Sequence, residues 1–424
     1  MRRILVAFGF SRDREIVEPN TQFLRECQFL HIYNTLTRTK EEVRSSGELK
    51  AFVCGPTVQD NVHLGHAKTY IAFDVLARWL LKSGQKVFLL MNITDVDDKI
   101  FDRAKKENLP YMEIADKFYR EFLEDLEALN IVTVSKFARV SKYVEDSALL
   151  VKQLLDSGTA YRLHDNVYFD TSKAHDFGKL SHQSELDLRL KQIDAAPGKK
   201  NAVDFLLWRA VPESSDGIWK TTVGSGRPGW HIEDSAVAFS NFGTPYDIHG
   251  GATELVFPHH EAELAQDEAI SGIVPFVKIW MHTGLLRKGH EKMSKSLGNV
   301  ITIREALKQS SADEIRFYFL SHHYKEEFQY DSESFNSSKK KFKIILDAAR
   351  VLPKRNTATE KLTTEPLLKV WTEFASAMDD DLDTGKALSI LLRIIEHAGN
   401  QSENKEELGI LFWNMIEALG FRIF

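Results

Sequence analysis

Apolar and polar positions alternate most clearly between residues 49 and 98 of this chain. Apolar residues first form a short strand-like run at residues 51–54, which Gly55 and Pro56 interrupt. From Ala67 they recur at helical spacing until Ser83 and Gly84, and residues 86–91 form a second strand-length run. Strand, helix and strand in this order predict a βαβ unit, in which ligands bind beyond the carboxyl ends of the strands.

The rest of the chain divides into strand-like and helical stretches. We expect strands at residues 167–170, 205–208, 246–251 and 276–281, and helices at residues 99–129, 141–157, 303–318 and from residue 367 onward. The polar composition of residues 156–227 is typical of an insertion between two halves of an α/β domain. The expected order is an N-terminal extension (1–29), the first half of a Rossmann-type domain (30–130), a connective insertion (131–226), the second half (227–300), linker helices (301–360) and a helical bundle (361–424).

Composition limits the classes of function. The 424 residues are enough for a large core and two or three domains, and a net charge of −6 argues against a generally basic nucleic-acid binder. No apolar run approaches the ~20 residues of a membrane-spanning helix. The two cysteines, Cys27 and Cys54, indicate no disulfide framework, so we expect a cytoplasmic protein.

The loop after the first predicted strand carries two histidines, His63 and His66. They lie three residues apart at the start of a helix, so they share a face where free N–H groups and the helix dipole attract a phosphate. Gly65 between them lets a phosphate or a base approach the backbone closely. The imidazoles can then hydrogen-bond oxygens on which negative charge builds during displacement. Taken alone, the pattern is also that of an ordinary surface loop.

A second phosphate-binding element is predicted at residues 292–296, which read Lys-Met-Ser-Lys-Ser. Lys292 and Lys295 supply positive charge, and the serine hydroxyls and backbone N–H groups can donate hydrogen bonds to a triphosphate. Such a stretch by itself is often a solvated turn. Its pairing with the histidine loop, one in each half of an α/β domain, favours a nucleotide site.

A third group of residues can hold a metal ion. His259 and Glu263 lie four residues apart and share one helical face, and an imidazole with a carboxylate at this spacing suits zinc. The same spacing also occurs in ordinary surface pairs. Cys54, at the end of the strand before the histidine loop, adds a thiolate, so the three side chains could bind Zn²⁺ and leave a position for a substrate.

These motifs resemble those of the class I aminoacyl-tRNA synthetases, whose two hallmark loops are of the HIGH and KMSKS types. Within that class the chain is similar to the cysteinyl-tRNA synthetases, in which zinc binds the thiol of the substrate cysteine. Residues 52–58, 229–235 and 257–263 match the family stretches FVCGPTV, GWHIECS and FPHHENE, and the likeness runs from about Leu30 to the end of the chain. The resemblance implies a class I synthetase catalytic domain with an inserted connective region, followed by a C-terminal helical bundle.

The resemblance also implies a reaction and a set of roles. Cysteine would be activated with ATP and Mg²⁺ to cysteinyl-adenylate, and the acyl group would pass to the 3′ end of tRNA(Cys), with a monomer as the working form. His63 and His66 would stabilise the transferring phosphate, and Lys292 and Lys295 the pyrophosphate. The other implied contacts are Gly65, His249, Gly250 and Gly251 with ATP, and Gly55, Thr57, Asn92 and Trp230 with the amino acid.

One implied zinc ligand departs from the family pattern. The family has a second cysteine where this chain has Asp234, so the expected ligand set is Cys54, Asp234, His259 and Glu263. A site with one thiolate is harder and binds zinc less tightly. Zinc accounts for selectivity because a thiol binds as thiolate, whereas shape alone distinguishes similar side chains by only ~1–3 kcal/mol. Nearby Ala252 and Ala262 also depart from the pattern, which bears on amino-acid selectivity.

Three readings of function stay open at this point. A cysteine–tRNA ligase is the leading one, although the family continues into an anticodon-reading domain past the bundle and this chain stops at Phe424. A cysteine ligase that joins adenylated cysteine to an amino-sugar shares the same motifs and is the alternative. The third is a synthetase-like binding protein without activity. A basic run at residues 339–355 could follow a tRNA backbone, or could be a solvated helix face.

Overall fold

We describe a computed structural model of the chain at residues 29–174, 176–212, 216–243, 245–289, 291–292, 298–354, 362–398 and 404–423. Most of the expected N-terminal extension, with Cys27, lies outside these residues, as does Lys295. Among the helices of the described part, none is both long and apolar enough to cross a bilayer.

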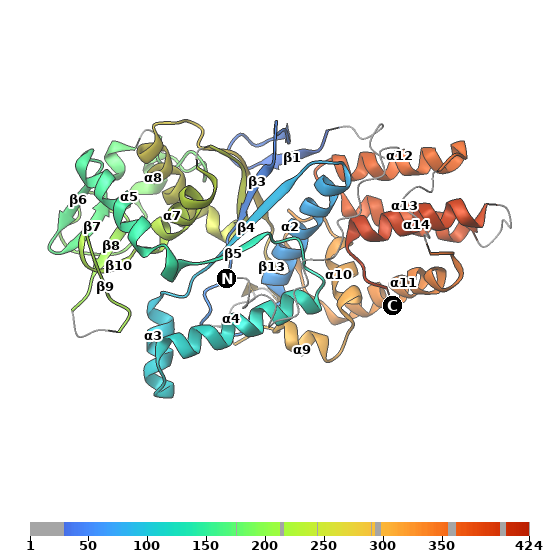
Figure 1. Cartoon of the computed structure of the whole chain (residues 1–424), viewed down its shortest axis with the longest axis horizontal. Coiled ribbons are helices and arrows are strands. Elements are labelled where there is room, and N and C mark those ends of the chain that lie inside the picture. Colours follow the sequence, from blue (N-terminus) through green and yellow to red (C-terminus); the bar gives the residue numbers. More distant parts are fainter. Residues whose placement is uncertain are drawn as a thin grey trace.

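A five-stranded parallel sheet forms the centre of the molecule, as the βαβ pattern predicts (Figure 1). Its strand order is β12-β11-β3-β4-β5, and every neighbouring pair is parallel. The strands are β3 (Leu49–Val53), β4 (Val87–Ile93), β5 (Lys136–Arg139), β11 (Tyr246–Ala252) and β12 (Val277–Thr283). Strands from two distant parts of the sequence therefore meet at β3 and β11, so residues near 54 and near 250 lie side by side.

Helix α2 (Leu64–Lys82) connects β3 to β4 and ends at Ser83, close to the expected position. Most of its side chains are buried, because the sheet covers one side of the helix and the C-terminal helices cover the other. The helical stretch expected at residues 99–129 is two helices, α3 (Asp98–Glu107) and α4 (Tyr111–Ala128). The break has a local cause. Asn108, at the end of α3, adopts a left-handed conformation, and Pro110 is the N-cap residue directly before α4.

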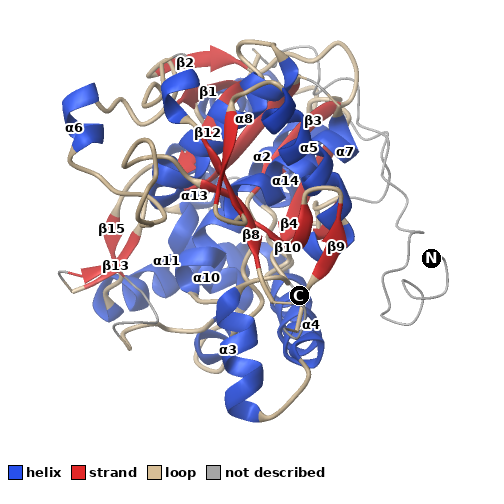
Figure 2. Ribbon diagram, turned by 90° about the vertical axis from the view of Figure 1, so that its left-hand side faces the viewer, coloured by secondary structure: helices blue, strands red, loops and turns tan. Residues whose placement is uncertain are grey.

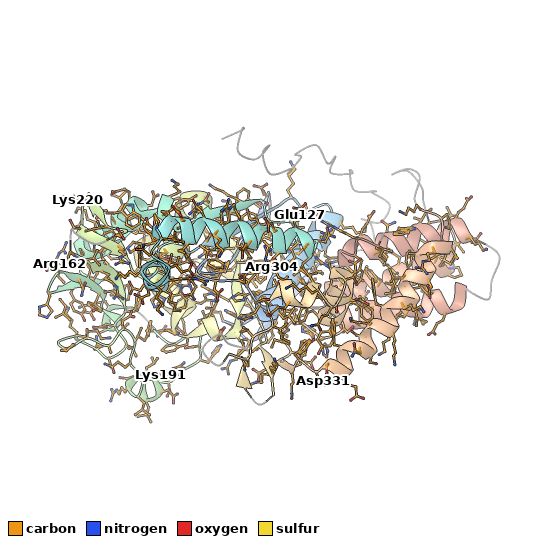
Figure 3. The ribbon with its side chains drawn as sticks, turned by 90° about the horizontal axis from the view of Figure 1, so that it is seen from below. Glu127, Arg162, Lys191, Lys220, Arg304 and Asp331 are labelled. Carbon is orange, nitrogen blue, oxygen red and sulfur yellow. The ribbon has the colours of Figure 1, made fainter. Side chains whose placement is uncertain are left out.

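The insertion forms its own antiparallel sheet, in the order β6-β7-β8-β10-β9, at one end of the molecule (Figure 1). Its elements are α5 (Val144–Asp156), β6 (Ala160–Leu163), β7 (Asn166–Phe169), α6 (Glu185–Arg189), β8 (Leu206–Ala210), β9 (Trp219–Thr221) and β10 (Gly224–Pro228). Its apolar residues form a second core together with residues of the following helices, such as Ile232 and Ala262, and this core includes the stacked rings of Phe169 and Phe205. Figure 3 places Arg162 and Lys220 on this end.

The structure moves the boundary that we expected at residue 131. Strand β5 pairs with β4 in the central sheet, so the first half of the catalytic domain extends past residue 130 and the insertion begins after β5. The four-residue strand escaped detection because its sequence, Lys-Phe-Ala-Arg, is short and half polar. Helices α7 (Trp230–Phe242) and α8 (Glu261–Ser271) then return the chain to the central sheet.

The C-terminal part is helical, as expected, and occupies the end opposite the insertion (Figure 1). It comprises α9 (Ile303–Leu307), α10 (Ala312–Leu320), α11 (Ser332–Val351), α12 (Glu365–Asp379), α13 (Thr384–Ala398) and α14 (Lys405–Leu419). Trp79 of α2 packs against Phe374 of α12 and donates a hydrogen bond to Asp379 at 2.7 Å. The helical bundle therefore contacts the helix that begins at the histidine loop. Figure 3 marks Asp331, which caps the start of α11.

Small sheets complete the fold. They pair β1 (His31–Asn34) with β2 (Thr39–Glu42), and join β13 (Leu286–Lys288) to β14 (Glu291–Lys292) and β15 (Phe328–Gln329). In Figure 2 the ribbons of β13 and β15 lie to one side of the molecule, close to α10 and α11. Lys292 thus sits on the edge strand that leads into the predicted lysine–serine element.

Candidate active site and metal centre

The two histidines of the predicted phosphate loop begin helix α2. His63 is the N-cap residue, and its Nδ1 accepts a hydrogen bond from the N–H of Gly65 at 3.1 Å. The N–H of His63 donates in return to Nδ1 of His66 at 3.3 Å, and the two rings lie 4.0 Å apart. The pairing fixes both rings on the face of the helix that begins at the carboxyl edge of the sheet.

The same hydrogen bonds assign the tautomer of both rings. Because each Nδ1 accepts a backbone N–H, the neutral imidazoles of His63 and His66 carry their protons on Nε2. An Nε2–H group is a donor that can bind a phosphate oxygen. A Cβ at Gly65 would lie 2.9 Å from the ring of His63. Glycine therefore leaves space for the paired histidine rings, in addition to letting a nucleotide approach the backbone.

Residues that follow the predicted lysine–serine element are hydrogen-bonded to the histidine loop. Lys292 ends β14, and the segment resumes in the described part at Gly298. The N–H of Leu64 donates to the carbonyl of Ile301 at 2.9 Å, and the N–H of Ile303 donates to the carbonyl of Val62 at 3.1 Å. The chain just after the lysine–serine element is therefore hydrogen-bonded to the histidine loop.

The four predicted metal ligands come from separate parts of the sequence and meet at one point. Cys54 follows β3, and Asp234 lies in the first turns of α7. His259 lies in the short helix η4 (Val256–His260), and Glu263 lies in the first turn of α8, which follows it directly. Their ligand atoms all lie within 4.8 Å of one another, and all four side chains are buried. The structure thus brings residues almost 210 positions apart into a compact group of a thiol, an imidazole and two carboxylates. Their role as metal ligands stays a prediction.

The distances within this group suit a tetrahedral ion. Sγ of Cys54 lies 3.4 Å from Oδ2 of Asp234, and Nε2 of His259 lies 3.3 Å from that oxygen and 3.0 Å from Oε1 of Glu263. Zinc holds such atoms at about 2.0–2.3 Å, which places neighbouring ligand atoms roughly 3–4 Å apart. Oε1 of Glu263 is buried, so it is shielded from water and lies within ion-pair distance of His259. The residues present therefore fit Zn²⁺.

The charges of the group also call for a cation. Burial, followed by Asp234 and Glu263, raises the pKa of the Cys54 thiol. Burial raises the pKa of Glu263 to about 7, against the opposing effect of His259. Burial lowers the pKa of His259, but Glu263 and Asp234 outweigh it and raise that pKa to about 9. In the metal-free protein the imidazolium of His259 supplies the positive charge that a metal ion would supply.

Two histidines that the predicted ligand set does not contain border the same group. His260 Nε2 lies 3.0 Å from Sγ of Cys54, and His249 Nε2 lies 3.5 Å from it. With Cys54 and Glu263 they form a second, overlapping set of ligand atoms within 4.8 Å. The His-His-Glu stretch at residues 259–261 contained the signal, but helical spacing alone does not reveal that both adjacent histidines face inward.

His249, which is expected to contact adenosine, lies beside the metal group. Its ring is 1% exposed and stacks on Phe52 at 4.6 Å, and its Nδ1 lies 2.5 Å from the hydroxyl of Tyr246. The contact of His249 with adenosine stays a prediction. Gly250 is explained by packing, because an added Cβ would lie 1.8 Å from the carbonyl oxygen of Met281 on β12. At Gly251 an added Cβ would lie 2.8 Å from Cδ1 of Leu255, and only in ordinary contact, at 3.6 Å, with Cβ of Cys54.

Trp230 forms the outer wall of the metal group. Its ring stacks on that of His259, with centroids 4.0 Å apart and planes at 10°, and the side chain stays 45% exposed. Trp230 also lines a cavity of about 100 Å³, together with Asp97, Asp98, Arg209, Arg227 and Glu233 among others. The indole therefore borders both the ring of His259 and an accessible cavity.

The three remaining residues expected at the amino acid, Gly55, Thr57 and Asn92, lie at the ends of β3 and β4. A Cβ at Gly55 would lie 1.8 Å from the carbonyl oxygen of Asn92, so only glycine allows the two strand ends to come this close. Thr57 forms an isolated parallel bridge with Thr94. Asn92 is 2% exposed and donates a hydrogen bond to Oδ1 of Asp234 at 2.6 Å. Its contact with substrate stays a prediction.

Comparisons with known proteins agree with this geometry. A family model described as the tRNA synthetases class I (C) catalytic domain matches residues 40–340. In fold, the chain superposes on Mycobacterium tuberculosis methionyl-tRNA synthetase in complex with methionyl-adenylate, with a TM-score of 0.62, 15% identity, and coverage of 88% of this chain and 89% of that one. An Agrobacterium radiobacter LeuRS in a ternary complex with tRNA gives a TM-score of 0.60 at 10% identity, covering 88% and 83%. The fold is that of a class I tRNA synthetase.

Sequence relatives narrow the class. A cysteine–tRNA ligase of Thermoplasma acidophilum is 39% identical over 383 residues, which cover 89% of this chain and 83% of that protein. Those of Thermococcus onnurineus and Idiomarina loihiensis are 41% and 38% identical, covering 86% and 88% of this chain and 79% and 81% of theirs. The chain belongs to the cysteine–tRNA ligase family of class I tRNA synthetases.

Proposed function

We propose that this chain activates cysteine with ATP and transfers the cysteinyl group to the 3′ end of tRNA(Cys), acting as a monomer. The observation that carries the proposal is the convergence of Cys54, Asp234, His259 and Glu263 beside the histidine loop, at the carboxyl edge of the central sheet. Family membership supports the reaction, and the buried ligand group supports cysteine as the amino acid.

Zn²⁺ held by these four residues would bind the substrate thiol as thiolate, which serine cannot imitate because its hydroxyl is hard to ionise. Trp230 would close the pocket and exclude water from the thiol, since its ring covers His259. The described part of the chain thus offers both the recognition group and a wall for a small side chain.

The residues of the histidine loop would act on the phosphate. In activation, a carboxylate oxygen of cysteine attacks the α-phosphorus of Mg-ATP and pyrophosphate leaves. Negative charge grows on the phosphate oxygens, and the Nε2–H groups of His63 and His66, with the N-terminus of α2, are placed to stabilise it. Lys292 and Lys295 would bind the leaving pyrophosphate, and Gly65 would admit the nucleotide.

The test is aminoacylation of a tRNA(Cys) transcript with labelled cysteine, with a tRNA for another amino acid as control. We expect charging of tRNA(Cys) only, and its loss in Cys54→Ser. Cysteinyl-adenylate formation without charging, together with transfer to an amino-sugar, would instead establish the amine ligase. Absence of adenylate in folded, zinc-loaded protein would leave only the inactive binding protein.

A further inference from the structure

Asn92 holds one side of the Asp234 carboxylate by a short hydrogen bond. Its Nδ2 donates to Oδ1 of Asp234 at 2.6 Å, and its Oδ1 accepts from the N–H of Gly55 at 2.6 Å. Asn92 and Asp234 are 2% and 1% exposed, so water does not replace these bonds readily. We propose that Asn92 is a positioning residue that fixes Asp234 as a one-oxygen metal ligand and so keeps a coordination position open for the substrate thiol.

This inference rests on the proposed metal centre and adds a residue outside its ligand set. A carboxylate can bind a metal ion through one oxygen or through both. With Oδ1 engaged by Asn92, the second oxygen, Oδ2, is the one that lies 3.4 Å from Sγ of Cys54 and 3.3 Å from Nε2 of His259. The hydrogen bond therefore decides which oxygen faces the other ligands.

The number of ligand atoms matters for the reaction. Zinc is usually four-coordinate but can expand to five ligand atoms. With four residues that give one atom each, the substrate sulfur would have to take that fifth position. A carboxylate of Asp234 that turned and bound through both oxygens would fill that position. By occupying Oδ1, Asn92 lets Asp234 contribute charge without competing with the substrate.

The same amide ties two ligand-carrying elements together. Asn92 lies near the end of β4, and its Oδ1 holds the backbone of Gly55, the residue directly after Cys54. The missing side chain at Gly55 lets the two strand ends approach, because a Cβ there would lie 1.8 Å from the backbone oxygen of Asn92. One side chain thus links the thiol ligand on the sheet to the carboxylate ligand on α7.

The experiment measures Co²⁺ binding to the full chain after removal of bound metal. Cobalt reports a thiolate ligand and its coordination number through its absorption bands, independently of activity. We compare Asn92→Leu, which has a similar size and lacks both polar groups, with Asn92→Ser, which leaves room for water if the leucine variant does not fold. Thr94→Val is the matched control, because the Thr94 hydroxyl lies 3.5 Å from the same amide nitrogen and is not one of the candidate ligands.

We expect both Asn92 variants to weaken Co²⁺ binding, by about 10–100-fold for Asn92→Leu, and to shift the absorption bands, with Thr94→Val unchanged. When Asp234 is also replaced by cysteine, the Asn92 substitutions should weaken Co²⁺ binding much less. A thiolate has a single ligand atom and offers no second atom for Asn92 to hold. Equal losses in the two backgrounds, or unchanged bands in folded Asn92 variants, would overturn the inference.

A failure of the metal centre itself would look different. Wild-type protein without a thiolate–cobalt band would contradict the proposed ligand set and, with it, the role of Asn92. A wild-type band together with a raised KM for cysteine and unchanged cobalt binding in the Asn92 variants would make Asn92 a substrate contact instead, and would reject the positioning role alone.

Discussion

Replacing Arg316 by methionine tests how the C-terminal helices are joined to the helix of the histidine loop. Arg316 lies on α10 and is fully buried. Its Nη2 donates to Oδ2 of Asp74 on α2 at 2.7 Å and to the carbonyls of Leu129 and Asn130 at 3.1 and 2.9 Å, and its Nη1 donates to the carbonyl of Leu419 at 3.3 Å. Methionine keeps the apolar stem and removes all four hydrogen bonds.

The magnitude follows from what the substitution leaves unpaired. Removing one partner of a buried ion pair costs about 3–5 kcal/mol, and a buried acceptor without a donor costs about 1–3 kcal/mol. Asp74 keeps Arg78 and the hydroxyl of Thr133, so the lower part of the range applies. We expect Arg316→Met to lower the free energy of unfolding by about 3–4 kcal/mol.

Arg78→Met is the matched control. Arg78 binds the same Asp74 oxygen at 2.7 Å, but its side chain is 18% exposed, so water can replace part of what is lost. We expect a loss of about 1–2 kcal/mol for this variant. The assay is urea unfolding at pH 7 followed by tryptophan fluorescence. The reasoning would be refuted if Arg316→Met lowered the free energy of unfolding by no more than Arg78→Met does.

The pH dependence gives a second check on the same pair. Burial raises the pKa of Asp74, but Arg78 and Arg316 outweigh it and hold that pKa below its usual value. A carboxyl whose pKa is lower in the folded state stabilises the fold above its unfolded pKa, and this contribution is lost as pH falls through the folded value. The difference between wild type and Arg316→Met should therefore be complete at pH 7 and shrink below about pH 4.

Three further predictions concern the site and its support. Zinc affinity should rise between pH 7 and 9 with the release of about two protons per ion, because the pKa of His259 is about 9 and that of Cys54 is raised. Competition with a chelator measures zinc affinity across this pH range. An affinity that does not change with pH would exclude these ligands. Lys68→Met should destabilise the protein by about 2–4 kcal/mol, since the buried ammonium binds three backbone carbonyls; thermal unfolding without a loss would contradict that role. His66→Ala should lower the rate of adenylate formation about 10²–10³-fold with unchanged zinc content; an unaltered rate in single-turnover assays would remove His66 from phosphate stabilisation.

The sequence contained most of the fold because its strongest patterns are local. The helix after the histidine loop has continuous apolar periodicity and a clear end at Ser83, and α2 follows it closely. The four candidate metal ligands were predicted from stretches that match motifs of the resembled family, with Asp234 at the position of a family cysteine. The structure brings them together, and their binding of a metal stays a prediction. Strand β5 and the break at Pro110 were missed, because a short half-polar strand and a helix restart depend on tertiary packing and local turn geometry.

The finer structure of the site required coordinates. The hydrogen bond of Asn92 to Asp234 joins residues 142 positions apart, and periodicity cannot say which strand end faces which helix. The register of His249 opposite Phe52 on β3 and its ring 3.5 Å from Sγ of Cys54 could not be read from the sequence. In parallel sheets, side chains alternate between faces, so one strand carries both packing residues and ligands.

Amino-acid-dependent ATP–pyrophosphate exchange, with cysteine and serine side by side and tRNA absent, tests the central claim most directly. The account predicts exchange with cysteine alone in zinc-loaded protein, its loss after chelation and its return when zinc is added back. Equal exchange with serine, or full exchange with cysteine after the metal has been removed, would contradict a thiol-selective zinc centre formed by Cys54, Asp234, His259 and Glu263.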